Sequence, residues 1–284
     1  MPDTVAVALH EVVRARLKQA STPPLERTDT LLPRWTLKRL SAWVKETFNI
    51  ACSRETLRKT LKRLGFSWKK ARKLLNKASP AKRSAFLKTL EELLDDALHE
   101  RCVLVYVDEA HIHLDTDEGY GWSICGERFW VSSSSPGRAK VSFYGIYLYD
   151  LAQVRIWPYA KANSEFTMEM LTRLRAEFPD QPIKLVWDGA SYHRALKVRA
   201  QAQALDIALV PLPGYSPDFM PVEHLWHWLR EEVTYHTCYD TKDDLIAQVE
   251  QFQHRVNQDA LALSLRLWVT TQLDPEVEKL RVST

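Results

Sequence analysis

Two short apolar runs limit what this chain can fold into more than any other feature. Cys102–Val107 reads CVLVYV, and Ile183–Trp187 reads IKLVW. Short runs that are almost entirely apolar are typical of strands covered on both faces, which occur in sheets flanked by helices. We therefore expect an α/β domain. Each run is followed directly by an aspartate, Asp108 or Asp188.

The segments around these runs alternate between strand and helix patterns. The composition, 45% hydrophobic and 26% charged residues, is that of an ordinary globular protein and argues against bulk disorder. Strands in succession, followed by strands that alternate with helices, indicate a sheet of mixed direction. The further strands are predicted at residues 128–132, 140–148, 154–159 and 207–210, and the helices at 164–178, with Ser164 as cap, 192–205, 222–233 and 242–257.

The charge is divided unevenly along the chain. The formal net charge is only +3, but residues 1–90 hold 21 Lys and Arg against 6 Asp and Glu, a balance of +15. Residues 91–284 hold 18 against 30, a balance of −12. Such polarity indicates a part that binds a polyanion, followed by a separate acidic part.

A compact helical unit is predicted in the basic part. Apolar residues at helical spacing indicate helices over 36–48 and 54–64, with Ser53 as a cap, Gly65 at the end and a short strand or wing at 66–69. A helix with an apolar back and a basic front, preceded by another helix, suits the major groove of DNA, whereas a merely solvated basic helix leaves the large surplus unexplained. The residues assigned to the groove are Arg54, Arg58, Lys59, Lys62 and Arg63, and those assigned to the phosphate backbone are Lys69, Lys70, Arg72 and Lys73.

Three acids are candidates for catalysis. Asp108 and Asp188 would meet at one edge of the sheet if their strands are neighbours, and Glu223 begins the helix after a Pro-rich turn at 211–221. Convergent carboxylates repel one another unless cations neutralise them, and ligands that are all oxygen favour Mg²⁺ or Mn²⁺ over zinc. Two such ions can support phosphoryl transfer. Taken singly, each acid is better explained as a turn or helix-cap residue.

The segments around these acids make the interpretation specific. They are Val107–Glu109 (VDE), Trp187–His193 (WDGASYH) and Leu212–Trp226 (LPGYSPDFMPVEHLW), and 34 residues separate Asp188 from Glu223. These motifs and this spacing resemble the DDE transposases of the Tc/mariner superfamily, most closely its bacterial insertion-sequence "six-thirty" branch. The resemblance covers roughly residues 34–235 and departs from the family where Gly189 and Met220 stand, since Asn is usual at both positions.

The resemblance implies both a fold and a reaction. The fold is an RNase H-like α/β domain, a mixed sheet flanked by helices, preceded by a small all-α (winged) helix-turn-helix domain. Asp108, Asp188 and Glu223 would be the catalytic acids and would hold two Mg²⁺ ions, for which Mn²⁺ can substitute. The reaction would be cut-and-paste transposition: cleavage of strands at the element ends, then attack of the freed 3′-hydroxyl on target DNA. The partners would be double-stranded DNA, both terminal inverted repeats and target, and a second copy of the chain in a homodimer.

The expected domains follow from the charge and the motifs. Relatives commonly carry two helix-turn-helix units, so the N-terminal piece is interpreted as a truncated first unit. The predicted divisions are 1–33, a helix over 4–19 and a linker; 34–85, the helix-turn-helix domain and a basic linker; 86–260, the catalytic domain; and 261–284, a C-terminal tail.

Histidines and a second acid surround the first two aspartates. Glu109 should point to the opposite face of the strand from Asp108, and it is assigned a supporting role together with His193, which lies five residues past Asp188. His111 and His113 alternate along an extended segment and could ligate a metal together, although such histidines are more often plain surface or core residues. The letters DEAH at 108–111 do not indicate a helicase, because no phosphate-binding loop precedes them.

Several classes of protein are excluded, and two alternatives stay open. The sequence has no apolar stretch near the roughly 18–20 residues that span a bilayer, no secretory signal pattern and no C-x-x-C. We therefore expect a cytoplasmic protein, associated with the bacterial nucleoid and without membrane contact. One alternative is a non-catalytic or domesticated relative that binds DNA ends and represses. The other is a nuclease of the same fold that acts on RNA–DNA hybrids.

Overall fold

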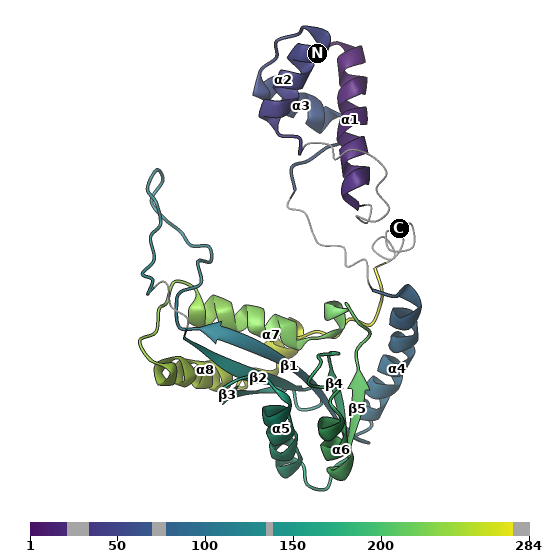
Figure 1. The fold of residues 1–284 in the computed structure, drawn as a ribbon, viewed down its shortest axis with the longest axis vertical. Coiled ribbons are helices and arrows are strands. Elements are labelled where there is room, and N and C mark those ends of the chain that lie inside the picture. The colour runs from purple at the N-terminus through teal and green to yellow at the C-terminus, as the bar shows by residue number, and fades with distance from the viewer. Residues whose placement is uncertain (22–33, 70–77, 135–138, 275–284) are drawn as a thin grey trace. The chain divides into compact units, whose positions relative to one another are not determined.

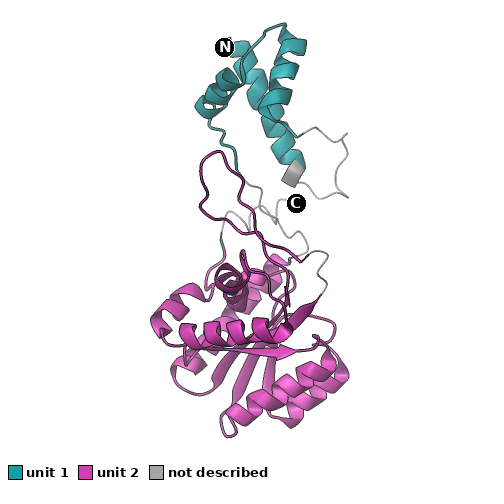
Figure 2. Ribbon diagram, turned by 90° about the vertical axis from the view of Figure 1, so that its left-hand side faces the viewer, with its two compact units in different colours: residues 1–76, 274–284 teal, residues 77–273 magenta. Residues whose placement is uncertain are grey.

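The chain forms two compact units in this computed structural model (Figure 2). The structure describes residues 1–21, 34–69, 78–134 and 139–274. The first unit comprises residues 1–76 with 274–284, and the second comprises residues 77–273. The boundary therefore lies earlier than the predicted residue 85. The reason is that helix α4 (Pro80–Leu98) buries Phe86, Leu90 and Leu93 in the core of the second unit.

Three helices make up the described part of the first unit. They are α1 (Asp3–Ser21), α2 (Leu37–Phe48) and α3 (Arg54–Arg63) (Figure 1). All three contribute to one core, so α1 is not the separate N-terminal piece that the sequence predicted. The linker predicted after the helix over 4–19 lies mostly outside the described residues. The buried side chains of this core are Val5, Leu9, Leu40, Val44 and Leu57.

The predicted caps of the helix-turn-helix unit are present, but the wing is not a strand. The hydroxyl of Ser53 accepts a hydrogen bond from the Thr56 N–H at 3.1 Å, which begins α3. Gly65 has a φ of 85°, the left-handed conformation expected where a helix ends. Residues 66–69 contain no strand, since no described segment pairs with them and an isolated strand is not stable.

The second unit is built on the predicted mixed sheet (Figure 1). The strand order is β3-β2-β1-β4-β5; β2 is antiparallel to both β1 and β3, whereas β4 is parallel to both β1 and β5. Two pairs of strands therefore run in parallel at the side of the sheet that carries β4 and β5. The strands are β1 (Val103–His113), β2 (Lys140–Leu148), β3 (Gln153–Tyr159), β4 (Ile183–Trp187) and β5 (Ile207–Pro211).

Helices cover both faces of this sheet. Alternate residues of β1 point to opposite sides: Leu104 and Tyr106 join one core, and Val105 and Val107 join the other. This explains why the run CVLVYV shows no polar alternation. On the first face lie α4, α7 (Val222–Leu229), α8 (Lys242–Val256) and α9 (Ala260–Arg266), and on the second face lie α5 (Ser164–Glu177) and α6 (Leu196–Ala204).

Several predicted elements differ from the structure. Residues 128–132 form no strand. The cap of α5 is Asn163 rather than Ser164, because the Asn163 side chain accepts hydrogen bonds from the Glu165 and Phe166 N–H groups. The predicted helix over 222–233 changes at Arg230–Thr234 into a single wider π-helical turn. Residues 261–284 are not simply a tail, since Leu263 of α9 and Leu267 are buried in the main core.

None of the helices in the described part of the chain combines enough residues with enough apolar character to span a membrane.

Candidate active site

Asp108 and Asp188 lie at the same level of the sheet. The last parallel pair of β1 and β4 is Val107 with Trp187, and each aspartate follows its member of that pair. The sequence predicted that Asp108 lies at the end of its strand. In the structure β1 instead continues to His113 and pairs there with β2 alone. The two aspartates are therefore neighbours in the backbone where β4 ends and β1 runs on.

Asp108 is held from the side of α7. The indole N–H of Trp226 donates to Oδ2 of Asp108 at 3.0 Å. Directly opposite Asp108 on β2 stands Gly145. A Cβ atom at Gly145 would lie 2.4 Å from the Trp226 ring and 2.9 Å from Val222. The glycine thus permits α7 to approach the sheet closely enough for this hydrogen bond.

Asp188 is held by the turn that follows it. Its Oδ1 accepts from the Ala190 N–H at 2.9 Å and lies 2.9 Å from Nδ1 of His193. The other ring nitrogen of His193, Nε2, lies 2.8 Å from Oε1 of Glu109. Glu109 is on the opposite face of β1 from Asp108, as predicted. The hydroxyl of Tyr192 donates to its Oε2 at 3.2 Å.

This use of His193 explains why α6 begins at Leu196 and not at residue 192 as predicted. The ring of His193 stacks on Trp187 with centroids 4.3 Å apart and an angle of 7° between the planes. A helix that began at Tyr192 would replace the turn that places this ring within hydrogen-bond distance of the Asp188 carboxylate.

Glu223 stands in the first turn of α7, where an acid is favoured by the helix dipole. The short helical turn Pro217–Phe219 precedes it. The guanidinium of Arg83, on α4, donates to both carboxylate oxygens of Asp218 at 2.9 and 2.6 Å and lies 4.9 Å from the centre of the Phe219 ring. Arg83 is only 2% exposed, so the loop before Glu223 is fixed to α4 by a buried cation.

The pKa values reflect a crowded set of acids. Burial, and then repulsion from Glu223 and Glu109, raises the pKa of Asp108 to about 8. Partial desolvation and the nearby Asp188 also raise the pKa of Glu223. The hydrogen bond from His193 holds the pKa of Asp188 below its usual value. Burial alone would lower the pKa of His193, but its bonds to Asp188 and Glu109 raise it to about 9.

The chemistry of these acids fits a divalent cation that prefers oxygen. Asp108, Asp188 and Glu223 are linked by mutual repulsion, which a bound cation relieves. Within the described residues, no three His, Cys, Asp or Glu side chains form a ready-made metal site. Nδ1 of His111 lies 2.9 Å from the Ser142 hydroxyl.

The basic residues predicted to bind DNA lie in the first unit. All five assigned to the groove are exposed on α3, and Lys69 is exposed after it. Arg58 forms an ion pair with Glu55 on the same helix, at 2.5 Å. Lys70, Arg72 and Lys73 lie outside the described residues.

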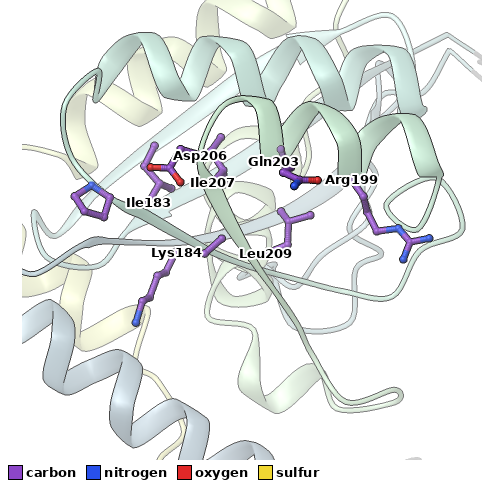
Figure 3. A pocket seen from close by; sticks show the side chains of 10 residues that line it. Ile183, Lys184, Arg199, Gln203, Asp206, Ile207 and Leu209 are labelled. Atoms are coloured by element: carbon purple, nitrogen blue, oxygen red, sulfur yellow. The ribbon is translucent and has the colours of Figure 1, made fainter.

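A pocket on the second unit lies away from the three acids (Figure 3). It is lined by Ile183 and Lys184 of β4, by Ile207 and Leu209 of β5 and by Arg199 of α6, among others. Ile183 begins the strand that Asp188 follows. The pocket therefore opens at the opposite end of β4 and is not part of the candidate site.

Sequence reasoning missed four residues that shape the site. Trp226 and Asp218 fall within the motif Leu212–Trp226, so their presence was noted without their contacts. A lone glycine in a strand pattern signals a close approach, and this could have identified Gly145. No local signal marks Arg83, whose partner is 135 positions away in the chain.

Comparison with known families identifies the second unit. Residues 103–246 match the family described as "DDE superfamily endonuclease", which is more than half of the chain and contains all three acids. The chain belongs to the DDE superfamily of endonucleases. Residues 33–90 of this DDE endonuclease match the family "Winged helix-turn helix", which confirms the predicted domain.

A curated relative matches most of the chain. The DDE endonuclease is 24% identical over 227 residues to the "Insertion element IS630 uncharacterized 39 kDa protein" of Shigella sonnei. The match covers 79% of this chain and 65% of that protein, so the chain spans less than two thirds of the relative's length. The predicted resemblance to insertion-sequence proteins is confirmed.

Solved structures confirm the predicted fold class of the DDE endonuclease. The Mos1 strand transfer complex has a TM-score of 0.60 at 17% identity, covering 95% of this chain and 84% of that one. The Mos1 transposase paired-end complex with left transposon end has a TM-score of 0.58 at 16% identity, covering 91% and 81%. The mariner Mos1 paired-end complex is also known with Mg and with Mn. At these identities the likeness is one of fold.

Proposed function

We propose that this DDE endonuclease is a DNA transposase. The observation that carries the proposal is the adjacent placement of Asp108 and Asp188 directly after the last parallel pair of β1 and β4, with Glu223 electrostatically coupled to each. Ligands of α/β sheets gather at this kind of strand end. The reaction would cleave strands at the ends of a mobile element and transfer the freed 3′-hydroxyl to target DNA.

Asp108, Asp188 and Glu223 would hold the divalent cations, two Mg²⁺ for which Mn²⁺ can substitute. When bound, such ions stabilise the charge that develops on the attacking and leaving oxygens of phosphoryl transfer. In support, the Mos1 complexes, whose fold this chain shares, are known with Mg and with Mn. The pKa of Asp108 is raised to about 8, and a positive charge nearby would stabilise its ionised form.

The protein's own residues would orient the acids. Trp226 holds one oxygen of Asp108 by its indole N–H, and His193 with Ala190 holds one oxygen of Asp188. The Arg83–Asp218 ion pair fixes the loop that leads to Glu223. Acids fixed in this way can present their remaining oxygens in a constant geometry, which lowers the cost of reaching the transition state.

The substrate would be duplex DNA, held by the basic face of α3 and by the basic segment that follows. Counter-ions released from the phosphates would supply much of the affinity. Because the Mos1 complexes contain paired transposon ends, we extend to this chain the expectation of a homodimer on paired element ends.

The test is strand cleavage of a duplex that carries the inverted repeats flanking the gene, with Mg²⁺ or with a chelator. Asp108→Asn, Asp188→Asn and Glu223→Gln should each abolish cleavage, while DNA binding in a gel-shift assay survives. Asp180→Asn is the matched control, because Asp180 is exposed in the loop before β4, at the opposite end of that strand from Asp188. Cleavage retained in an acid variant would contradict the role of that acid. If wild type bound the ends but never cleaved them, the non-catalytic alternative would hold instead.

A further inference from the structure

We propose that Glu109, His193 and Tyr192 form a positioning chain that fixes the carboxylate of Asp188 for metal binding. The inference rests on the proposed function, because it assigns these residues a task at the same site. None of the three is proposed to touch the DNA or the reacting phosphate.

His193 is the centre of the chain. Its two ring nitrogens lie 2.9 Å from Oδ1 of Asp188 and 2.8 Å from Oε1 of Glu109. The side chains of His193 and Glu109 are only 1% and 6% exposed, whereas that of Asp188 is 54% exposed. One buried imidazole, itself held by the buried Glu109 carboxylate, thus contacts the exposed carboxylate of Asp188.

The imidazole has little freedom to rotate. One face lies parallel to the Trp187 ring at 4.3 Å, and the Tyr192 ring meets it edge-on at 4.6 Å with an angle of 73°. Tyr192 also donates to the second oxygen of Glu109, so both ends of the His193 hydrogen-bond system are anchored. The direction of the bond to Asp188 is therefore set by the packing of β4 and the following turn.

The hydrogen bonds to the Asp188 carboxylate are all on one oxygen, and Nδ1 of His193 also lies 3.3 Å from the Asp188 backbone oxygen. His193 and the Ala190 N–H both act on Oδ1, and in the described part of the chain no hydrogen bond is made to Oδ2. An exposed aspartate without such contacts would sample several rotamers and would lose entropy on binding an ion. The positioning chain fixes the Asp188 carboxylate before an ion binds, so that this entropy is not lost on binding and Oδ2 stays available to the ion.

A purely structural role for His193 would also explain its burial, since a buried polar ring needs partners. The two roles differ in what the removal of His193 does to the ion affinity of a folded protein. Partners of metal-ligating groups typically contribute about 10–100-fold to metal affinity. A buried hydrogen bond elsewhere on the same face contributes to stability only.

The experiment is a titration of the full chain with Mn²⁺, without DNA, in which free Mn²⁺ is followed by electron paramagnetic resonance. His193→Ala should weaken Mn²⁺ binding by about 10–100-fold. His193→Asn, whose amide can still donate to Asp188, should recover part of that loss. Glu109→Gln, which keeps an acceptor for His193, should lose less than His193→Ala.

Thr167→Val is the matched control. It removes the buried hydrogen bond between Thr167 and the Tyr144 hydroxyl, 2.8 Å long and on the same face of the sheet, without touching Asp188. It should lower the melting temperature and leave Mn²⁺ affinity unchanged. Asp188→Asn is the second reference and should lose the ion altogether.

The outcomes separate the two proposals. If His193→Ala bound Mn²⁺ as wild type does while Asp188→Asn did not, the positioning chain would be overturned and the proposed function would stand. Equal losses of affinity in His193→Ala and Thr167→Val would also overturn it. If wild type bound no Mn²⁺, both proposals would fail. Should His193→Ala not fold, unchanged affinity in both Glu109→Gln and Tyr192→Phe would decide against the chain.

Discussion

At the scale of single residues, the site depends on a glycine that carries no chemistry. Gly145 faces Asp108 across the β1–β2 pair, and its missing side chain is the space that Trp226 occupies. The indole N–H of Trp226 donates a hydrogen bond to the Asp108 carboxylate. A methyl group added at Gly145 on β2 would therefore affect Asp108 indirectly, by displacing Trp226 of α7.

Gly145→Ala tests this dependence. The added Cβ would overlap the Trp226 ring, so α7 must move, and overpacking of this kind costs about 1–3 kcal/mol. We expect the free energy of unfolding in urea to fall by that amount and cleavage to fall with it. Gly214→Ala is the control, since a Cβ at Gly214 meets no atom within 4 Å and should change stability little. Equal stability of both variants would contradict the close approach.

The sequence predicted the three acids but not their surroundings. The side of Glu109 followed from the twofold alternation of a strand. The end of β1 did not, because the apolar run stops at Val107 while Ala110 and Ile112 continue the burial on one face only. The role of His193 was not predictable either, since its helical pattern was overridden by contacts with Asp188 and Glu109.

At the scale of elements, α4 and the loop before α7 act as one piece. Arg83 is buried on α4, and its two hydrogen bonds to Asp218 and its contact with Phe219 join segments that are far apart in sequence. Phe86 adds a ring contact with Phe219 at 5.1 Å. The position of Glu223 thus depends on α4, a helix that the predicted boundary at residue 85 divides between two domains.

A double-mutant cycle measures this link. Arg83→Met and Asp218→Asn should each destabilise the protein, and the double variant should lose less than their sum, with a coupling of about 0.5–3 kcal/mol in urea unfolding. The exposed pair of Arg58 and Glu55 is the control, and its cycle should show no measurable coupling. Additive effects of the Arg83 and Asp218 substitutions would mean that the ion pair does not stabilise the loop.

Strands β4 and β5 were predicted almost to the residue, because β4 is a short apolar run with clear ends. The elements that failed are those whose conformation depends on distant partners. The segment at 128–132 has strand-forming residues but pairs with no strand in the described part of the chain. Helix α9 is too short for a helical spacing of apolar residues to be recognised in the sequence. Periodicity reports local burial, whereas pairing is a property of the whole sheet.

At the scale of the whole molecule, the division of charge corresponds to the division into units. The net positive part of the sequence contains α3 and its exposed basic residues, and the three acids belong to the second unit. A single total of +3 conceals both properties. On this account DNA binding and ion binding are separable functions of one chain.

Lys62→Ala tests that separation. If Lys62 neutralises one phosphate, its loss should weaken binding to all duplexes and reduce the slope of log affinity against log salt by about 0.9. Mn²⁺ affinity without DNA should not change. Lys242→Ala, an exposed lysine in the first turn of α8, is the control and should leave the slope unaltered. An unchanged slope for Lys62→Ala would remove this residue from the DNA interface.

The most direct test of the account is strand transfer itself. A labelled, pre-cut duplex with the element's terminal sequence is incubated with the protein, Mg²⁺ and a second duplex, once with a 3′-hydroxyl and once with a 3′-dideoxy end. The account predicts joined products with the 3′-hydroxyl end, none with the dideoxy end and none with Glu223→Gln. If a protein that cleaves uncut ends gave no joined product with the 3′-hydroxyl end, the result would contradict it, because the protein would then be a nuclease and not a transposase.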